Sequence, residues 1–212
     1  MHSLKVKERK HLHQILVNET WIFGDEYTYG ADDITLKNVL KEYIKSLGRD
    51  DFAEIVEQDD NSDLRTIPDV CLWRQFSTGH LSEYRNLVIE LKKPTVDGGF
   101  AELNQIQSYA QKVAKDPRFP KEHTRWTFVL LVRDVKEEIE PQLNQANRHY
   151  GHVFASDHFD VWVIRWGNII HEAKARYKYV KDKLDISFKN NNDALSHLKA
   201  KYEQYLPEEF AK

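Results

Sequence analysis

The sequence has little of what builds covalent or membrane-bound frameworks. Among its 212 residues there is a single cysteine, Cys71, which excludes an internal disulfide framework and suits a reducing cytoplasm. No apolar run approaches the length of a membrane span, and the basic N-terminal residues are not followed by the apolar core of a signal peptide. We therefore expect a soluble, cytoplasmic protein with no membrane partner.

Several catalytic motifs are missing as well. There is no Gly-x-x-x-x-Gly-Lys phosphate loop and no Gly-x-Ser-x-Gly elbow, so neither nucleotide hydrolysis within this chain nor serine-hydrolase chemistry has support. The net charge of −3 argues against a general nucleic-acid coat protein. His149, His152 and His158 lack a cysteine cluster, and we interpret them as loop and surface histidines.

Composition and charge distribution indicate one globular unit. With 41% hydrophobic and 12% aromatic residues, the chain can bury one core. We expect a single domain over residues 1–212, with its core at about 8–170 and a helical extension at about 171–212. Residues 1–14 and 172–189 each sum to about +3, which indicates either a phosphate-tracking surface or a solvated face.

The most informative segment runs from Asn86 to Pro94 and reads N-L-V-I-E-L-K-K-P, an apolar run typical of a buried strand. Alternation places Glu90 and Lys92 on one face of that strand, about 7 Å apart. Upstream, Asp69 follows Pro68 at the start of a second strand-like segment. The intervening residues are long enough for an antiparallel hairpin, so Asp69 and Glu90 can converge on one Mg²⁺ ion.

Two interpretations of this charged cluster remain open. A charged pair inside an apolar strand is costly unless it is paired or ligates a metal. Glu90 and Lys92, or Asp69 and Lys92, therefore either form a buried salt bridge or belong to a metal-dependent site. The other Glu-x-Lys triplets of the chain lie in charge-rich stretches, where a solvated helix face is the simpler reading.

A helix is predicted directly after this strand, over residues 100–114, because apolar residues recur there at helical spacing. Glu102, Gln105 and Tyr109 share an adjacent face of it. Gln105 and Tyr109 either hold Lys92 and the nucleic-acid strand or form the polar shoulder of an amphipathic helix.

Asp69, the triplet Glu90-Leu91-Lys92 and the pair Gln105-x-x-x-Tyr109, in this order, resemble the PD-(D/E)XK nuclease superfamily and its Gln-x-x-x-Tyr subset. The stretches 11–16 and 21–27 resemble the opening of the Shedu-type nuclease domain of bacterial anti-phage defence. The resemblance covers roughly residues 8–166. It implies an α/β, restriction-endonuclease-like core: a mixed central sheet flanked by helices in the order αβββαβ, with extra N-terminal and C-terminal helices.

The resemblance also implies the role of each site residue. Asp69 and Glu90 become ligands of Mg²⁺ or Mn²⁺, together with the backbone carbonyl of Leu91, and Lys92 positions the attacking water. Many members add a glutamate from the first helix, for which Glu8 and Glu19 are candidates, and His11 stands where an acid is expected.

The remaining segments complete the expected layout. Helices are predicted at residues 6–18, from Asp33 or Thr35 through Leu47, at 136–150 and from about 191 onward. Strands are predicted at residues 52–57, 125–133 and 159–166, with 169–179 pairing back as a hairpin.

These observations predict a metal-dependent DNA endonuclease of anti-phage defence. The alternative is a catalytically silent nuclease-like module of a larger protein, which binds nucleic acid or mediates oligomerisation. We further expect a homo-oligomer, with a sensor or ATPase region in the same full-length protein.

Overall fold

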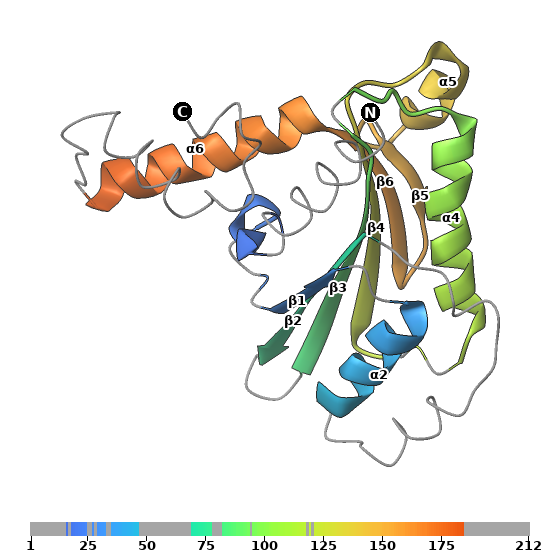
Figure 1. Ribbon diagram of the computed structural model, residues 1–212, viewed down its shortest axis with the longest axis vertical. Helices are drawn as coiled ribbons and strands as arrows, with labels where there is room; N and C mark the ends of the chain where they lie inside the picture. The colour runs from blue at the N-terminus through green and yellow to red at the C-terminus, as the bar shows by residue number, and fades with distance from the viewer. Residues whose placement is uncertain are drawn as a thin grey trace, which may run out of the picture.

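The computed structural model describes residues 16, 18–24, 27, 29–32, 35–46, 69–77, 82–93, 95–117, 119 and 121–184. These residues form a mixed sheet with helices packed against it (Figure 1). The α/β class predicted from the sequence is therefore confirmed.

Within the described residues the sheet has six strands in the order β1-β2-β3-β4-β6-β5. The strands β1, β2 and β3 are antiparallel neighbours, β3, β4 and β6 run parallel, and β5 returns antiparallel to β6. Their bounds are β1 Tyr29–Asp32, β2 Val70–Ser77, β3 Ser82–Leu91, β4 Thr124–Val132, β5 His152–Ala155 and β6 Phe159–Arg165.

The register of the β2–β3 hairpin decides which side chains share a face. Cys71 pairs with Val88, and Val70 pairs with Ile89. Because side chains alternate along a strand, Val88 and Glu90 lie on one face of β3, whereas Ile89 and Leu91 lie on the other. Each face carries its own apolar core, so a slip of one residue would place Glu90 in the wrong core.

The helix α4 (Phe100–Lys115) connects β3 to the parallel strand β4 and covers the Val88 face (Figure 1). Its apolar stripe is buried, as predicted: Leu103, Ile106, Ala110 and Val113. Two carboxylates bind the backbone N–H groups at its start. Glu102 accepts from Gly99 at 2.9 Å and Glu138 accepts from Phe100 at 3.1 Å. A Cβ atom on Gly99 would collide with the Glu138 carboxylate, which would then have to move.

The helix α2 (Leu36–Ser46) packs its apolar residues into the same core as α4. The hydroxyl of Thr35 accepts a hydrogen bond from the Asn38 N–H at 3.2 Å, which makes Thr35 the N-cap residue. Of the two predicted caps, Asp33 lies outside the described residues.

The predicted hairpin strand at residues 169–179 is wrong, because this segment belongs to the helix α6 (Trp166–Leu184). The strand β6 is already paired on one side with β4 and on the other with β5, so no free edge remains for a further strand. Ile169 and Ala173 are instead buried on one side of α6. Ile169 belongs to the apolar core on the sheet face opposite α4.

The predicted helix at residues 136–150 is also wrong in extent. The chain forms a short 3-10 helix, η3 (Glu137–Ile139), and one turn of α-helix, α5 (Glu140–Leu143), with Pro141 in its first turn. Proline has no backbone N–H and is tolerated only at a helix start, so a continuous helix cannot pass through it. Beyond Leu143 the chain is polar, and Asn147 adopts a left-handed backbone with φ 62°.

Other predictions divide between those confirmed and those outside the described residues. The strand predicted to start at Asp69, the strand predicted within residues 86–94 and those predicted at 125–133 and 159–166 are present as β2, β3, β4 and β6. The third antiparallel strand, β1, precedes α2 and was not predicted, and neither was β5. The predicted strand 52–57, the tail helix and almost all of the first helix lie outside the described residues; the 3-10 helix η1 (Thr20–Ile22) follows that first segment.

In the described part of the chain, no helix is both long enough and apolar enough to cross a membrane.

The packing of α4 yields a stability prediction. Replacing the fully buried Ile106 by alanine leaves a cavity between α4 and the sheet, and we expect a loss of about 2–5 kcal/mol of unfolding free energy. The matched control is Asn104→Ala at an exposed position of the same helix, which should change stability by less than about 0.5 kcal/mol. Urea denaturation measures both, and equal midpoints for the two variants would contradict this packing.

Candidate active site

Asp69 stands immediately before β2, opposite the end of β3. One step of the β2–β3 register beyond the Val70–Ile89 pair places Asp69 across from Glu90. The carboxylate of Asp69 is buried and accepts the Leu91 N–H at 2.6 Å through Oδ2. Asp69 therefore continues the hairpin ladder with a side chain and brings its negative charge beside that of Glu90.

Glu90 is buried, with 2% of its surface exposed, and both of its carboxylate oxygens have partners. Its Oε1 accepts from Lys92 Nζ at 2.8 Å and from Gln105 Nε2 at 2.7 Å. Its Oε2 accepts from the Tyr109 hydroxyl at 3.1 Å. Two of these donors come from α4, so the crossover helix supplies part of what an ionised carboxylate needs in an apolar core.

Gln105 joins the partners of Glu90 into a closed ring of hydrogen bonds. Its Oε1 accepts from Lys92 Nζ at 2.7 Å, and its Nε2 donates to both Glu90 and, at 2.8 Å, the Tyr109 hydroxyl. Gln105 and Tyr109 stand one helical turn apart, so both reach the same carboxylate. The two residues are thus part of the site and not a solvated shoulder of the helix.

Lys92 is fixed through its backbone as well as its side chain. Its N–H donates to the Leu131 carbonyl of β4 at 2.8 Å, and its own carbonyl accepts the indole N–H of Trp166 at 2.9 Å. Sequence analysis did not identify Trp166, because 74 residues separate it from Lys92. Spacing patterns along the sequence report on neighbouring residues and cannot predict a contact between residues so far apart in the chain.

The electrostatics of the site are dominated by burial. Burial raises the pKa of the Glu90 carboxyl, and the neighbouring Asp69 charge raises it further; hydrogen bonds from Lys92 and Tyr109 oppose both effects. Burial likewise raises the pKa of the Tyr109 phenol, which remains a neutral donor to Glu90. Burial, and then Asp69, also raise the pKa of the Cys71 thiol, so Cys71 acts as a small core residue and not as a nucleophile.

The donor set at this point fits a hard divalent cation. Carboxylate oxygens are the ligands that Mg²⁺ prefers. Asp69 and Glu90 face each other across the hairpin, and Glu90 also pairs with the Lys92 ammonium group. The backbone carbonyl of Leu91 lies on the same edge of β3 as its N–H, which donates to Asp69. Asp69, Glu90 and the Leu91 backbone therefore lie next to one another, and their role as metal ligands stays a prediction.

A third acidic ligand is not found in the described part of the chain. No His, Cys, Asp or Glu there gathers with Asp69 and Glu90 into a metal-binding group of three, and this includes Glu19. The Glu19 carboxylate instead accepts the Trp21 indole N–H at 2.6 Å. Glu8 lies outside the described residues and stays a prediction.

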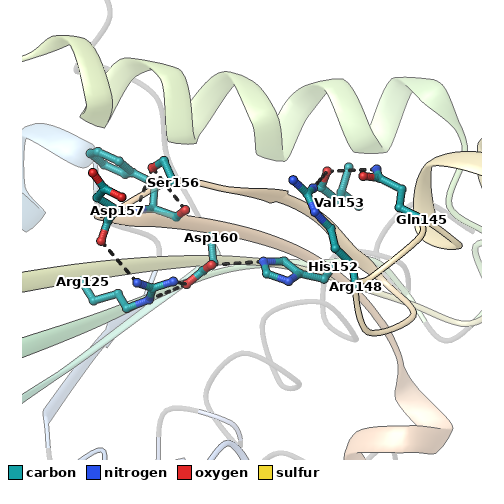
Figure 2. Close-up of polar contacts among 9 residues, drawn as sticks. Arg125, Gln145, Arg148, His152, Val153, Ser156, Asp157 and Asp160 are labelled. Atoms are coloured by element: carbon teal, nitrogen blue, oxygen red, sulfur yellow. Dashed lines mark hydrogen bonds and ion pairs between the residues drawn. The ribbon is translucent and has the colours of Figure 1, made fainter.

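A further buried carboxylate, Asp160, lies on the face of the sheet opposite α4. Figure 2 shows it between Arg125 and His152, which contact its Oδ2 and Oδ1 at 2.6 and 3.1 Å. The His152 ring also stacks on Trp162, with centroids 4.1 Å apart, so its interpretation as a surface histidine is wrong. This cluster ties β4, β5 and β6 together, and its partners account for the burial of Asp160.

The short edge strand β5 is protected against pairing with another chain. The Val153 carbonyl accepts hydrogen bonds from Gln145 at 3.2 Å and from Arg148 at 3.1 Å (Figure 2). A register shift between His152 and Phe154 further interrupts the strand. Occupied carbonyls, charge and bulges at an edge disfavour strand addition.

A pocket of about 440 Å³ opens between α4 and the β5–β6 hairpin. Among the residues that the structure describes, its lining has no ionisable side chain and so offers no acid, base or metal ligand. Its lining is Gln107, Ala110, Gln111, Ala114, Phe154, Ser156, Phe159 and Val161.

The raised pKa of Glu90 predicts a pH dependence of stability in metal-free buffer. The folded state holds this proton more tightly than the unfolded chain, whose glutamate titrates near 4.5. The unfolding free energy therefore falls as the pH rises from that value through the folded pKa. Glu90→Gln removes this fall, whereas the exposed control Glu122→Gln keeps it. Thermal unfolding measured across this pH range tests the point, and parallel profiles for wild type and Glu90→Gln would contradict it.

Comparison of the chain with protein-family models, with curated proteins and with solved structures found no match. A functional assignment therefore rests on the residues of the site. Asp69, Glu90, Lys92, Gln105 and Tyr109, all predicted from the sequence, meet at one end of β3.

Proposed function

We propose that this chain is a Mg²⁺- or Mn²⁺-dependent nuclease domain that hydrolyses phosphodiester bonds in DNA. The single observation that carries the proposal is the convergence of two buried carboxylates and one ammonium group. Asp69 comes from the start of β2, and Glu90 and Lys92 come from the end of β3. Support from the fold is the β2–β3 hairpin followed by a crossover helix and a parallel strand, which suits a restriction-endonuclease-like core. The third antiparallel strand, β1, lies beside β2 in the sheet but is separated from it in the chain by α2.

Each side chain has a role that follows from its contacts. Asp69, Glu90 and the Leu91 carbonyl would hold the cation, which supplies Lewis-acid polarisation of the phosphate and lowers the pKa of a bound water. Within the described residues, Lys92 Nζ gives two of its three N–H donors to Glu90 and Gln105. The third is directed by those two bonds and is suited to orient a water or a phosphate oxygen.

Hydrolysis of the phosphodiester needs no reactant besides water. A water oxygen bonds to phosphorus and the bond from phosphorus to the leaving oxygen breaks. One water proton passes to solvent, and the leaving oxygen takes up a proton from solvent. Gln105 and Tyr109 act on Lys92 and Glu90 rather than on substrate, so they are positioning residues. Their hydrogen bonds restrict Lys92 to one orientation, which reduces the entropy lost in reaching the transition state.

The cellular role proposed here follows the same resemblance. A Shedu-type domain implies anti-phage defence in the bacterial cytoplasm, activity as a homo-oligomer, and a sensor or ATPase region in the same full-length protein.

Cleavage of plasmid and linear DNA with Mg²⁺, Mn²⁺ or EDTA tests this function. We expect metal-dependent cleavage that falls about 100-fold or more in Asp69→Asn, Glu90→Gln and Lys92→Met, because each change removes a ligand or the orienting cation. Lys115→Met, at an exposed position near the end of α4, is the matched control and should cleave as wild type does. Calorimetric titration with Mn²⁺ should give a binding signal that Asp69→Asn loses. Undiminished cleavage in all three site variants would refute the assignment.

One observation favours a second candidate, a silent nuclease-like module that binds nucleic acid or holds copies of the chain together. Both oxygens of Glu90 already have protein partners, and three hydrogen bonds leave little of the carboxylate for a cation. DNA binding without cleavage, together with no heat of Mn²⁺ binding, would select this candidate over the nuclease.

A further inference from the structure

The helix α6 has one packed side and one exposed side. On the packed side Ile169 and Ala173 are buried, and Arg176 donates to the Trp21 and Ile22 carbonyls of η1 at 3.1 and 2.6 Å. These contacts hold the helix against the face of the sheet opposite α4. They leave the other side of α6 facing solvent.

The exposed side combines lysines with large apolar and aromatic groups. Ile170, Lys174, Tyr177 and Lys178 follow one another at i, i+4, i+7 and i+8, the spacing of a single helical stripe. Ile170 and Tyr177 are 45% and 47% exposed, and the nearby Tyr179 is 65% exposed. Exposed aromatic rings between cations are suited to a partner with both phosphates and flat ring faces.

Charge is concentrated on this helix. From Trp166 to Leu184 the sequence has five Lys or Arg residues and two acids, a formal charge of +3, while the whole chain carries −3. The helix is therefore opposite in sign to the chain as a whole, as residues 1–14 also are. Such an asymmetry attracts a polyanion to one part of an otherwise acidic protein.

The helix also begins at the candidate active site. Trp166 is its first residue, and the indole of Trp166 binds the Lys92 carbonyl at 2.9 Å. Figure 1 shows α6 extending from this end of the sheet away from α4. Nineteen residues span about 28 Å at 1.5 Å per residue, so the helix continues well beyond the site.

We propose that the stripe Ile170, Lys174, Tyr177 and Lys178 binds the sugar-phosphate backbone of DNA whose scissile bond lies at Lys92. This inference deepens the proposed function and rests on it for the identity of the substrate. Lys174 and Lys178 neutralise phosphates, and Tyr177 between them packs against sugar or base. A membrane surface fits less well, because the two lysines interrupt the continuous apolar face that an interfacial helix needs.

Fluorescence anisotropy with a labelled DNA duplex in EDTA tests this surface, using the full chain and no cleavage. The variant Lys174→Gln/Lys178→Gln should bind about 5-fold or more weakly at low salt. The slope of log affinity against log salt should fall by about 1.8, since each phosphate contact contributes about 0.9. Lys112→Gln/Lys115→Gln on α4 removes the same charge from a helix on the other face and should bind as wild type does. Thermal midpoints equal to wild type show that both variants fold.

The outcomes separate this inference from the proposed nuclease activity. Unchanged affinity and slope in the α6 variant, or an equal loss in the α4 control, would overturn the proposed surface. Binding of wild type to anionic lipid vesicles but not to the duplex would also overturn it. If α6-dependent duplex binding is found but Mg²⁺ and Mn²⁺ give no cleavage, the surface stands and the nuclease activity fails.

Discussion

The buried carboxylate of Glu90 is the constraint on which the rest of the site depends. An ionised group at 2% exposure is costly in an apolar core unless several donors replace its water shell. Those donors come from Lys92 on the same strand and from Gln105 and Tyr109 on the next helix. The crossover from β3 to β4 must therefore place α4 in one position along the strand, and the carboxylates that bind its first N–H groups help to hold it there.

The strand register satisfies the same constraint from the other side. Val88 and Glu90 face α4 only because Ile89 and Leu91 fill the opposite core. The hairpin then brings the Asp69 carboxylate to the Leu91 N–H. In a longer hairpin a backbone carbonyl of β2 would accept this N–H. Apolar packing thus fixes the strand register, and the register in turn fixes where the charged side chains lie.

This dependence explains which features were predictable. The β2–β3 hairpin and α4 follow from periodicities that extend over eight or more residues. Glu90, Gln105 and Tyr109 lie on these elements, and Asp69 and Lys92 directly adjoin them. The helix α6 was mistaken for a strand because Ile169 to Tyr179 contains apolar residues compatible with either period. What excluded a strand was the pairing of β6 with β5, a short strand that the sequence did not reveal. The hydrogen bond between Trp166 and Lys92 could not be predicted for the same reason: it depends on the order of the strands in the sheet and not on spacing along the chain.

The partners of Glu90 also indicate how the closed ring can open. Its Oε1 accepts two bonds of 2.8 Å or less, one of them from a charged ammonium group, whereas Oε2 accepts one bond of 3.1 Å from a neutral phenol. Charge-assisted bonds are the stronger kind, so the Tyr109 bond is the least costly to exchange. Tyr109 would keep its bond to the Gln105 amide after such an exchange, and the helix would not have to move. Oε2 can therefore turn toward a cation while Lys92 stays in place, so the protein partners of Glu90 are compatible with its proposed role as a ligand.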